Sequence, residues 1–422
     1  MKPRYNALWA NYRGSSLYIN DELVDYPEGK IPTGLFMSIY KGKSIREESV
    51  EKPNYIKPND LRDWQEHCLS LCLNSPKRRG VVKAATGTGK TRVQIEMLRT
   101  FKSGVITVPT RQLLHQTYDL LEELMPGKVG RVGDGHYELK DYIVAIPKTI
   151  LNKGLPKVDI WLADECHRLS NLEGWQTQLL IPSYWRFGFS ATPAEDLIET
   201  CIFGPRIYTY NPNHAIEDGV ILKPEVQYHS IKCLDLGTLA YRANKYFSSG
   251  FRDKMTIYSQ CLNKAILPNV ERNKLIVDLY LKCKSKGHKT IIIVERINGK
   301  NNQPEAINNI LSGRGLQALP IYSSKTSKPN KKKILEEFKE GKLDCIIAGP
   351  NSISEGADIK ECSALILATA DASTKKLIQR VGRVLRLGNE KPVIHCLQDE
   401  GYFFTNLSSK KKNILEETYN SI

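Results

Sequence analysis

Two series of short apolar runs, rich in β-branched residues, alternate with helical stretches along most of this 422-residue chain. The first series lies at residues 80–86, 104–110, 142–147, 158–165 and 186–192. The second series lies at residues 288–295, 316–323, 343–350, 363–370 and 391–398. Short apolar runs separated by helices are typical of parallel sheets covered by helices on both faces. The pattern predicts an α/β fold with two parallel-sheet domains in tandem.

The two series divide the chain into expected domains. We predict a first parallel-sheet domain over residues 57–225 and a second over residues 286–405. Residues 1–56 carry short strand patterns between turns, which predict a small β-rich N-terminal module. The polar, helical pattern of 226–285 predicts a connecting segment with a helical insertion, and residues 406–422 are expected to form a C-terminal tail.

The composition favours a polyanionic partner. Lys and Arg number 61 against 46 Asp and Glu, a formal net charge of +15, and such a charge is common among proteins that bind nucleic acid. No apolar run is long enough to cross a membrane, and the first residues lack the apolar core of a signal peptide. The 10 cysteines include no C-x-x-C pair, which argues against a metal site and favours a reducing, cytoplasmic location.

The loop after the first apolar run carries the strongest chemical signal. Residues 84–91 fit the phosphate-binding pattern G-x-x-x-x-G-K-[ST], except that Ala84 stands where the first glycine belongs. Glycines in such a loop let backbone N–H groups close around phosphates at a helix N-terminus. We expect Lys90 to bridge the β- and γ-phosphates of ATP and the Thr91 hydroxyl to hold Mg²⁺. The expected nucleotide contacts in the loop are Ala85, Thr86, Gly87, Thr88, Gly89, Lys90 and Thr91.

Two adjacent carboxylates end the run at 158–165. Asp164 is placed to hold the Mg²⁺, partly through water, and Glu165 is placed to accept a proton from the attacking water. Because Lys90 lies in the same predicted domain, the pair predicts a site for ATP hydrolysis.

The order of these motifs resembles that of the superfamily 2 nucleic-acid helicases and translocases of the DEAH-like branch, over roughly residues 57–405. The segment LRDWQ is similar to the upstream element in which an arginine and a glutamine approach adenine, here Arg62 and Gln65. The segment DECH at 164–167 resembles the DExH box. The resemblance implies two RecA-like domains that use ATP and Mg²⁺.

Two further segments extend the resemblance. Residues 190–193 (SATP) look like the S-A-T coupling motif, and residues 379–386 (QRVGRVLR) look like the last helicase motif, Q-R-x-G-R-x-x-R. The resemblance implies that the nucleotide site is coupled to the rest of the enzyme through His167, Ser190 and Thr192.

The arginines of the last motif can also be interpreted from charge alone. They recur at i, i+3 and i+6, so their charges repel one another unless anions face them. The alternative to an anion-binding role is that these arginines form a basic helix face exposed to solvent. Since the second domain has no phosphate loop of its own, we expect Arg383 and Arg386 to act on the γ-phosphate, with Gln379 near the nucleotide and water. An arginine of this kind can contribute about 10³–10⁵ in rate.

In the family, another motif precedes the last helicase motif, and residues 348–358 occupy its place in this chain. Many relatives have a threonine where this chain has Pro350, so the DNA-contacting hydroxyl of that threonine is absent here. Ser352 is the expected substitute. Gly356 and Asp358 fit the G-x-D element, and the resemblance implies that they meet the nucleotide ribose or an arginine.

Hydroxyls and cations at strand ends can hold phosphate oxygens without reading bases. The resemblance places such contacts after two runs of the first series and in the second domain. Helix capping or solvation is the alternative for Arg111 and Thr149. The expected nucleic-acid contacts are Pro109, Thr110, Arg111, Lys148, Thr149 and Ser352.

The region from 352 to 386, together with the chain length, most resembles bacteriophage branch-migration helicases of the UvsW kind. This implies an ATP-driven DNA helicase that remodels forked or branched DNA, acts as a monomer and, if a phage encodes it, works in the host cytoplasm. An RNA helicase, the duplex-DNA motor of a restriction or repair complex, and a non-catalytic binding protein are the alternatives. In residues 1–56, aromatic and basic side chains interleave, which fits either a base-stacking module or a small packed hairpin.

Overall fold

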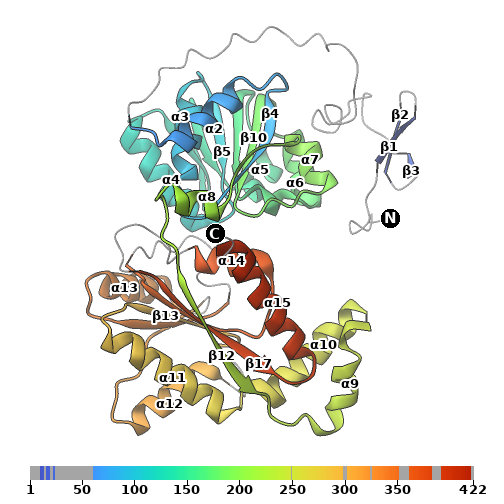
Figure 1. Ribbon diagram of the computed structural model, residues 1–422. Helices are drawn as coiled ribbons and strands as arrows, with labels where there is room; N and C mark the ends of the chain where they lie inside the picture. The colour runs from blue at the N-terminus through green and yellow to red at the C-terminus, as the bar shows by residue number, and fades with distance from the viewer. Residues whose placement is uncertain are drawn as a thin grey trace. The chain divides into compact units, whose positions relative to one another are not determined.

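The computed structural model describes residues 10–13, 16–19, 22–23, 60–248, 250–297, 302–323, 326–350, 361–382 and 391–419. The chain divides into two compact units, Met1–Asn211 and Pro212–Ile422. Each unit contains one large sheet with helices packed against it (Figure 1). The prediction of an α/β fold with two parallel-sheet domains is therefore confirmed. Within the described ranges, no helix has the length and apolar character needed to cross a bilayer.

The first unit is built on an 8-stranded sheet with the order β11-β4-β10-β9-β5-β8-β6-β7. Its strands are β4 (Arg79–Ala84), β5 (Gly104–Thr107), β6 (Val129–Gly133), β7 (His136–Tyr137), β8 (Tyr142–Ala145), β9 (Val158–Asp164), β10 (Ser183–Ser190) and β11 (Arg206–Tyr210). All pairs are parallel except β6 with β7. The central strands are almost wholly buried because their side chains are apolar on both faces.

Helices cover both faces of this sheet: Figure 1 shows α3 and α4 toward one side and α6 and α7 toward the other. Side-chain caps begin several of them, since Thr110, Asn171 and Asp196 each accept a hydrogen bond from a backbone N–H of the first turn. The helices are α2 (Asp63–Leu73), α3 (Lys90–Arg99), α4 (Arg111–Leu124), α5 (Pro147–Lys153), α6 (Leu172–Leu179) and α7 (Leu197–Phe203).

The second unit is built on a 6-stranded sheet with the order β12-β17-β16-β13-β15-β14. Its strands are β12 (Glu225–Lys232), β13 (Thr290–Val294), β14 (Ile321–Tyr322), β15 (Cys345–Ala348), β16 (Ala364–Ala368) and β17 (Val393–Glu400). Every pair in this sheet is parallel. Its helices are α8 (Pro212–Glu217), α9 (Ala240–Asn244), α10 (Phe251–Cys261), α11 (Val270–Ser285), α12 (Gln303–Gly313), α13 (Lys328–Lys339), α14 (Thr374–Val381) and α15 (Tyr402–Tyr419).

The segment 226–285, expected to be a connection, belongs instead to the second unit. β12 pairs with β17 along its whole length, and the buried face of α11 lies in the main core of the unit. Only the part between them is an insertion, and its buried residues around Ile257 and Leu262 pack in one cluster with Phe403 and Phe404 of α15. β12 was missed because its polar side chains are half exposed, as is usual on an edge strand.

Two more expected boundaries differ from the structure. The first unit ends at Asn211 rather than at residue 225. The expected tail at 406–422 contains most of α15, a helix that packs along β17. Phe404, Leu415 and Tyr419 of this helix are buried, so it is part of the core of the second unit.

The N-terminal segment contains a 3-stranded antiparallel sheet, in agreement with its expected β-rich character. Its strands are β1 (Ala10–Arg13), β2 (Ser16–Ile19) and β3 (Glu22–Leu23). The remaining residues of 1–56 lie outside the described ranges.

A buried ion pair fixes the helix α11 to the second sheet. Arg272 is fully buried and donates to both carboxylate oxygens of Asp399, with Nε to Oδ1 at 2.7 Å and Nη2 to Oδ2 at 3.1 Å. The same Nη2 donates to the Ala368 carbonyl at 2.9 Å. Removal of one member of such a pair leaves a buried charge without compensation.

We therefore expect Arg272→Met to lower the free energy of unfolding of the second unit by about 3–5 kcal/mol. Lys274→Met is the matched control, because Lys274 pairs with Glu271 at the surface of the same helix, where ion pairs contribute little. The urea midpoints of the two variants are compared by far-ultraviolet circular dichroism. An Arg272→Met midpoint equal to that of the control would contradict the importance of the buried pair.

The stability of the second unit should also depend on pH through the buried His395, which contacts the half-buried His229. His395 on β17 is 2% exposed, and its Nδ1 lies 3.0 Å from Nε2 of His229 on β12. Burial, and then the charge on His229, lowers the pKa of His395 to about 4 from an ordinary value of 6.5. As the pH falls from 6.5 toward 4, the unfolded state therefore takes up a proton that the folded state does not.

The free energy of unfolding should accordingly fall by about 2 kcal/mol between pH 7 and pH 5 through this group. His395→Gln should lose most of that slope while keeping a polar side chain at the position. The measurement is the urea midpoint at both pH values. An unchanged slope in the variant would show that His395 is not the group responsible.

Candidate active site

Most of the predicted site residues of the first unit lie at one edge of its sheet. The phosphate loop follows β4, Val108 and Thr110 follow β5, Asp164 ends β9 and Ser190 ends β10. Because these strands are parallel, their C-terminal ends lie together, which is where ligands bind in open α/β sheets.

The loop between β4 and α3 has a backbone shaped for close approach. Gly87 and Gly89 have φ values of 84° and 96°, a region that favours glycine. A Cβ on Gly89 would lie 2.7 Å from Nε2 of Gln65. Thr88 is fully buried and its hydroxyl donates to the Ala85 carbonyl at 2.8 Å. The loop is thus braced by an internal hydrogen bond, and it leads directly into the first turn of α3.

Two polar groups of this loop suit a phosphate ligand. The Nζ of Lys90 donates to the carbonyls of Ala84 at 3.1 Å and Ala85 at 3.2 Å, so its charge lies across the loop. The buried Thr86 hydroxyl has no hydrogen-bond partner within the described part of the chain. A buried polar atom without a partner is costly, and a bound phosphate would satisfy it.

The structure gives Arg62 and Gln65 a bracing position. Arg62 Nη1 donates to the Thr88 carbonyl at 2.9 Å, and Gln65 Nε2 donates to the Gly89 carbonyl at 3.1 Å. Both residues lie at the start of α2. Trp64 of this helix stacks on Tyr210 of the sheet, with 4.6 Å between the ring centroids. The two side chains therefore hold the phosphate loop through its backbone, and a contact with adenine remains a prediction.

Asp164 lies close to the helix that starts with Lys90. Its Oδ1 accepts a hydrogen bond from Gln94 Nε2 at 3.1 Å. Burial, followed by the neighbouring Glu165, raises the pKa of Asp164 to about 6, while Lys90 and Gln94 act in the opposite direction. A buried carboxylate of this kind gains from a cation nearby. The sequence analysis missed Gln94, although its position four residues after Lys90 places it on the same helix face.

Glu165, His167 and Ser190 meet through one hydroxyl group. Ser190 Oγ donates to Glu165 Oε2 at 3.3 Å, lies 2.8 Å from His167 Nδ1 and accepts from the backbone N–H of Thr192 at 3.0 Å. Glu165 itself has a φ of 48°, a strained backbone conformation that is often found at functional sites. The structure thus brings the DExH-like and S-A-T-like segments into direct contact.

A cavity of about 300 Å³ opens beside the two carboxylates. It joins Asp164 and Glu165 to Pro109 and Lys148, two of the expected nucleic-acid contacts. Arg168, which the sequence analysis did not single out, lines the same cavity. Its other lining residues are Thr107, Val108, Ile146, Pro147, Leu169, Asn171 and Glu173.

The other expected nucleic-acid contacts of the first unit lie at helix starts. Thr110 caps α4, since its hydroxyl accepts from the Leu113 N–H at 3.3 Å. Arg111 is 69% exposed and pairs with Asp134 at 3.2 Å. Thr149 is half-buried in the first turn of α5. Thr110 is thus a helix cap, a role that was not considered for it from the sequence, while Arg111 is exposed and paired with Asp134.

Five expected site residues of the second unit lie outside the described ranges. They are Ser352, Gly356, Asp358, Arg383 and Arg386. Gln379 lies in α14. The roles of these residues remain predictions.

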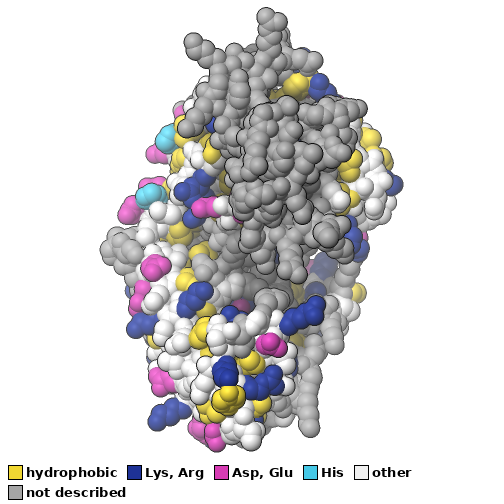
Figure 2. All heavy atoms as spheres, turned by 90° about the vertical axis from the view of Figure 1, so that its right-hand side faces the viewer, with side chains coloured by type: hydrophobic (Ala, Val, Ile, Leu, Met, Phe, Trp, Pro, Cys, Tyr) yellow, Lys and Arg dark blue, Asp and Glu magenta, His cyan; other side chains and the backbone are white. Residues whose placement is uncertain are grey.

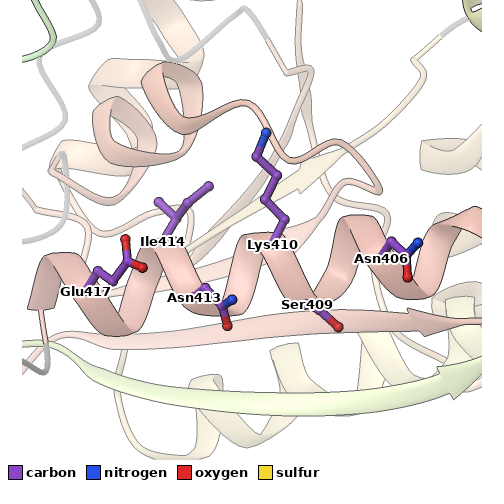
Figure 3. A pocket seen from close by; sticks show the side chains of 6 residues that line it. All are labelled: Asn406, Ser409, Lys410, Asn413, Ile414 and Glu417. Carbon is purple, nitrogen blue, oxygen red and sulfur yellow. The ribbon is translucent and has the colours of Figure 1, made fainter. Parts of the chain in front are cut away.

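On the face shown in Figure 2, the charged side chains of the described residues are dispersed. Figure 2 shows Lys and Arg side chains interspersed with Asp and Glu over the face that it presents. A second pocket, of about 520 Å³, lies along α15, and Figure 3 shows its lining side chains on that one helix. None of the predicted site residues is among them: the pocket is lined by Asn406, Ser409, Lys410, Asn413, Ile414 and Glu417.

Comparisons with known proteins agree with the two-domain arrangement. The family described as type III restriction enzyme, res subunit, matches residues 59–195, and the helicase conserved C-terminal domain family matches residues 271–388. The DNA 3'-5' translocase XPB2 of Sulfurisphaera tokodaii is 22% identical over 97% of this chain and 93% of that protein. The ATP-dependent RNA helicase DBP5 of Saccharomyces cerevisiae is 22% identical over 86% of this chain and 74% of that protein. The chain spans about half (51%) of another relative, IRC3 of the same yeast, at 24% identity.

Solved helicase structures share the fold. Saccharomyces cerevisiae Dbp5 bound to RNA and ADP BeF3 superposes with a TM-score of 0.57 at 18% identity, over 85% of this chain and 88% of that chain. The Pyrococcus furiosus Hef helicase domain superposes with a TM-score of 0.53 at 14% identity, over 83% of this chain and 98% of that chain. Both sheets therefore belong to RecA-like domains. The two family matches in this order along the chain, together with the helicase-named relatives, support an ATP-dependent helicase similar to those of superfamily 2.

Proposed function

We propose that the protein is an ATP-driven DNA helicase and translocase that unwinds or branch-migrates forked and junction DNA. The observation that carries this proposal is the cavity shared by Pro109 and Lys148 with Asp164 and Glu165. Groups suited to hold a phosphate backbone lie beside the groups suited to act on ATP. Binding of the backbone and hydrolysis of the nucleotide can therefore affect each other.

In this proposal the triphosphate occupies the loop between β4 and α3. Lys90 leaves the Ala84 and Ala85 carbonyls and bridges the β- and γ-phosphates, while backbone N–H groups of the loop surround them. Glu165 accepts the proton of the attacking water. Thr91 and Asp164 would hold Mg²⁺, which neutralises charge that develops on the phosphates.

We propose that Ser190 couples ATP hydrolysis to the rest of the enzyme. Its hydroxyl contacts both the proton acceptor Glu165 and the ring of His167, so a change in the charge of Glu165 alters a hydrogen bond to His167. The Thr192 hydroxyl is buried without a partner in the described ranges, which leaves it able to accept a new one. From the family resemblance we propose that Arg383 and Arg386 act on the γ-phosphate, with Gln379 close to the attacking water.

The preference for DNA is supported by the match to XPB2, whose name describes a DNA translocase, over 97% of this chain. The preference for branched DNA is supported by the resemblance of residues 352–386 to branch-migration helicases. RNA is the second candidate substrate, because DBP5 is named an RNA helicase and its RNA-bound structure shares the fold. Dispersed charge suits contacts with the backbone rather than with particular bases (Figure 2).

A panel of substrates tests this function. ATP hydrolysis and strand separation are measured with forked DNA, a four-way DNA junction, linear duplex DNA and a structured RNA, side by side. Junction and forked DNA should stimulate hydrolysis most and be remodelled. Stimulation by RNA alone would replace the proposal with an RNA helicase, and stimulation by duplex DNA without strand separation would replace it with a duplex motor.

We expect Lys90→Ala to abolish ATP hydrolysis, because the phosphates lose their positioned cation. Glu165→Gln should still bind Mg-ATP but hydrolyse it about 10²–10⁴-fold more slowly, because the proton acceptor is lost. Steady-state hydrolysis and calorimetric nucleotide binding distinguish the two effects. Lys102→Ala, at an exposed position beyond α3, is the control. Hydrolysis by Lys90→Ala at the control rate would show that the phosphate loop is misassigned.

The proposed backbone contact of Lys148 can be measured through salt dependence. Lys148→Gln should reduce the slope of log Kd against log salt by about 0.7 for single-stranded DNA, the share of one phosphate contact. Lys153→Gln is the matched control on the same helix, since Lys153 is exposed but does not line the cavity. Equal slopes for Lys148→Gln and wild type would remove Lys148 from the interface.

A further inference from the structure

One arginine of the last helicase motif is buried rather than presented to a ligand. Arg380 on α14 is 1% exposed. Its Nε and Nη2 donate to the Pro350 carbonyl at 3.3 and 3.2 Å, and its Nη1 donates to Thr369 Oγ1 at 3.2 Å and to Asp371 Oδ1 at 3.1 Å. One guanidinium group therefore joins α14 to the loop after β15 and to the loop after β16.

Three other charged side chains, from different parts of the second unit, fix the end of β16 and the loop that follows it. Arg272 Nη2 donates to the carbonyl of residue 368 at 2.9 Å, and Lys411 Nζ donates to the carbonyl of residue 369 at 2.7 Å. Glu295 accepts from the backbone N–H of residue 370 at 2.9 Å. This loop is thus a rigid support, and Arg380 connects α14 to it.

The bridge lies next to residues with proposed roles in hydrolysis. Gln379 directly precedes Arg380, and Arg383 and Arg386 follow it along the chain. Pro350 is the last described residue before the segment that contains Ser352, Gly356 and Asp358. A displacement of α14 would therefore also disturb the contact with Pro350.

We propose that Arg380 is a positioning residue for ATP hydrolysis: it fixes α14, which carries Gln379, and the Pro350 carbonyl after β15 to the loop after β16. This inference rests on the proposed function. A planar guanidinium can bond several acceptors in fixed directions, whereas a lysine presents one point charge on a flexible stem. Arg380→Lys should therefore keep the charge but lose the bridge between the two loops.

The test compares Arg380→Lys and Arg380→Gln with Phe338→Leu. Phe338 is fully buried in α13 of the same unit and makes no contact in the Arg380 bridge, so its substitution controls for a general loss of stability. Both Arg380 variants should lower kcat about 10–100-fold with little change in the KM for ATP, because misplacement by about 1 Å can cost about 10²-fold. The control should retain kcat.

Hydrogen exchange of the full-length protein gives a readout that does not depend on activity. Both Arg380 variants should exchange faster at 345–350 and 368–382 than wild type, whereas Phe338→Leu should not change these segments selectively. Unchanged exchange there would overturn the bridge. Faster exchange with kcat equal to that of Phe338→Leu, or full rescue of kcat by lysine, would overturn the positioning role. A wild-type protein without ATPase activity would contradict the proposed function, while the exchange comparison would still decide on the bridge.

Discussion

Parallel strand pairing is the constraint on which both units depend. It brings the C-terminal ends of the strands to one edge of each sheet. In the first sheet, this edge gathers the phosphate loop, Asp164 and Ser190, which are widely separated along the chain. The chemistry of the site follows from that placement: a cation and a glycine-containing loop after one strand lie near carboxylates at the end of another.

The two units use the same edge in different ways. In the first unit it is shaped around space for a ligand, with the Thr86 hydroxyl buried and unsatisfied within the described residues. In the second unit it is filled by charged side chains of the protein itself. Arg272 and Lys411 bond the main chain after β16, and Arg380 bonds across it to Pro350. In the described part of the second unit, this edge is therefore held in place by the protein's own charged side chains.

The sequence allowed prediction of features that are local in the chain. The phosphate loop and the adjacent carboxylates could be predicted because each motif lies within a few residues of one strand end. The Ser190 bridge needed the structure, since Ser190 ends β10 whereas Glu165 and His167 follow β9. The strand β12 was missed because a polar edge strand has no clear apolar alternation. Gln94 could have been found from its helical spacing relative to Lys90.

The corrections at the chain's domain boundaries have a similar cause. Composition suggested a connection at 226–285 and a tail at 406–422, yet both contain elements that pack on the second sheet. Whether a polar helix packs against a sheet depends on the partner surface, which the local sequence does not specify. The buried Lys411 illustrates this: its side chain is satisfied by the Thr369 carbonyl, far away in sequence.

The central claim is that the edge beside Lys90 and Asp164 binds Mg-ATP. An experimental structure of the full chain with Mg²⁺ and a non-hydrolysable ATP analogue tests it most directly. We expect the triphosphate within hydrogen-bond distance of the backbone N–H groups of residues 87–91, with Lys90 withdrawn from the Ala84 and Ala85 carbonyls and the metal between Thr91 and Asp164. An analogue bound at another place, or at this edge with its phosphates turned away from the loop, would contradict it.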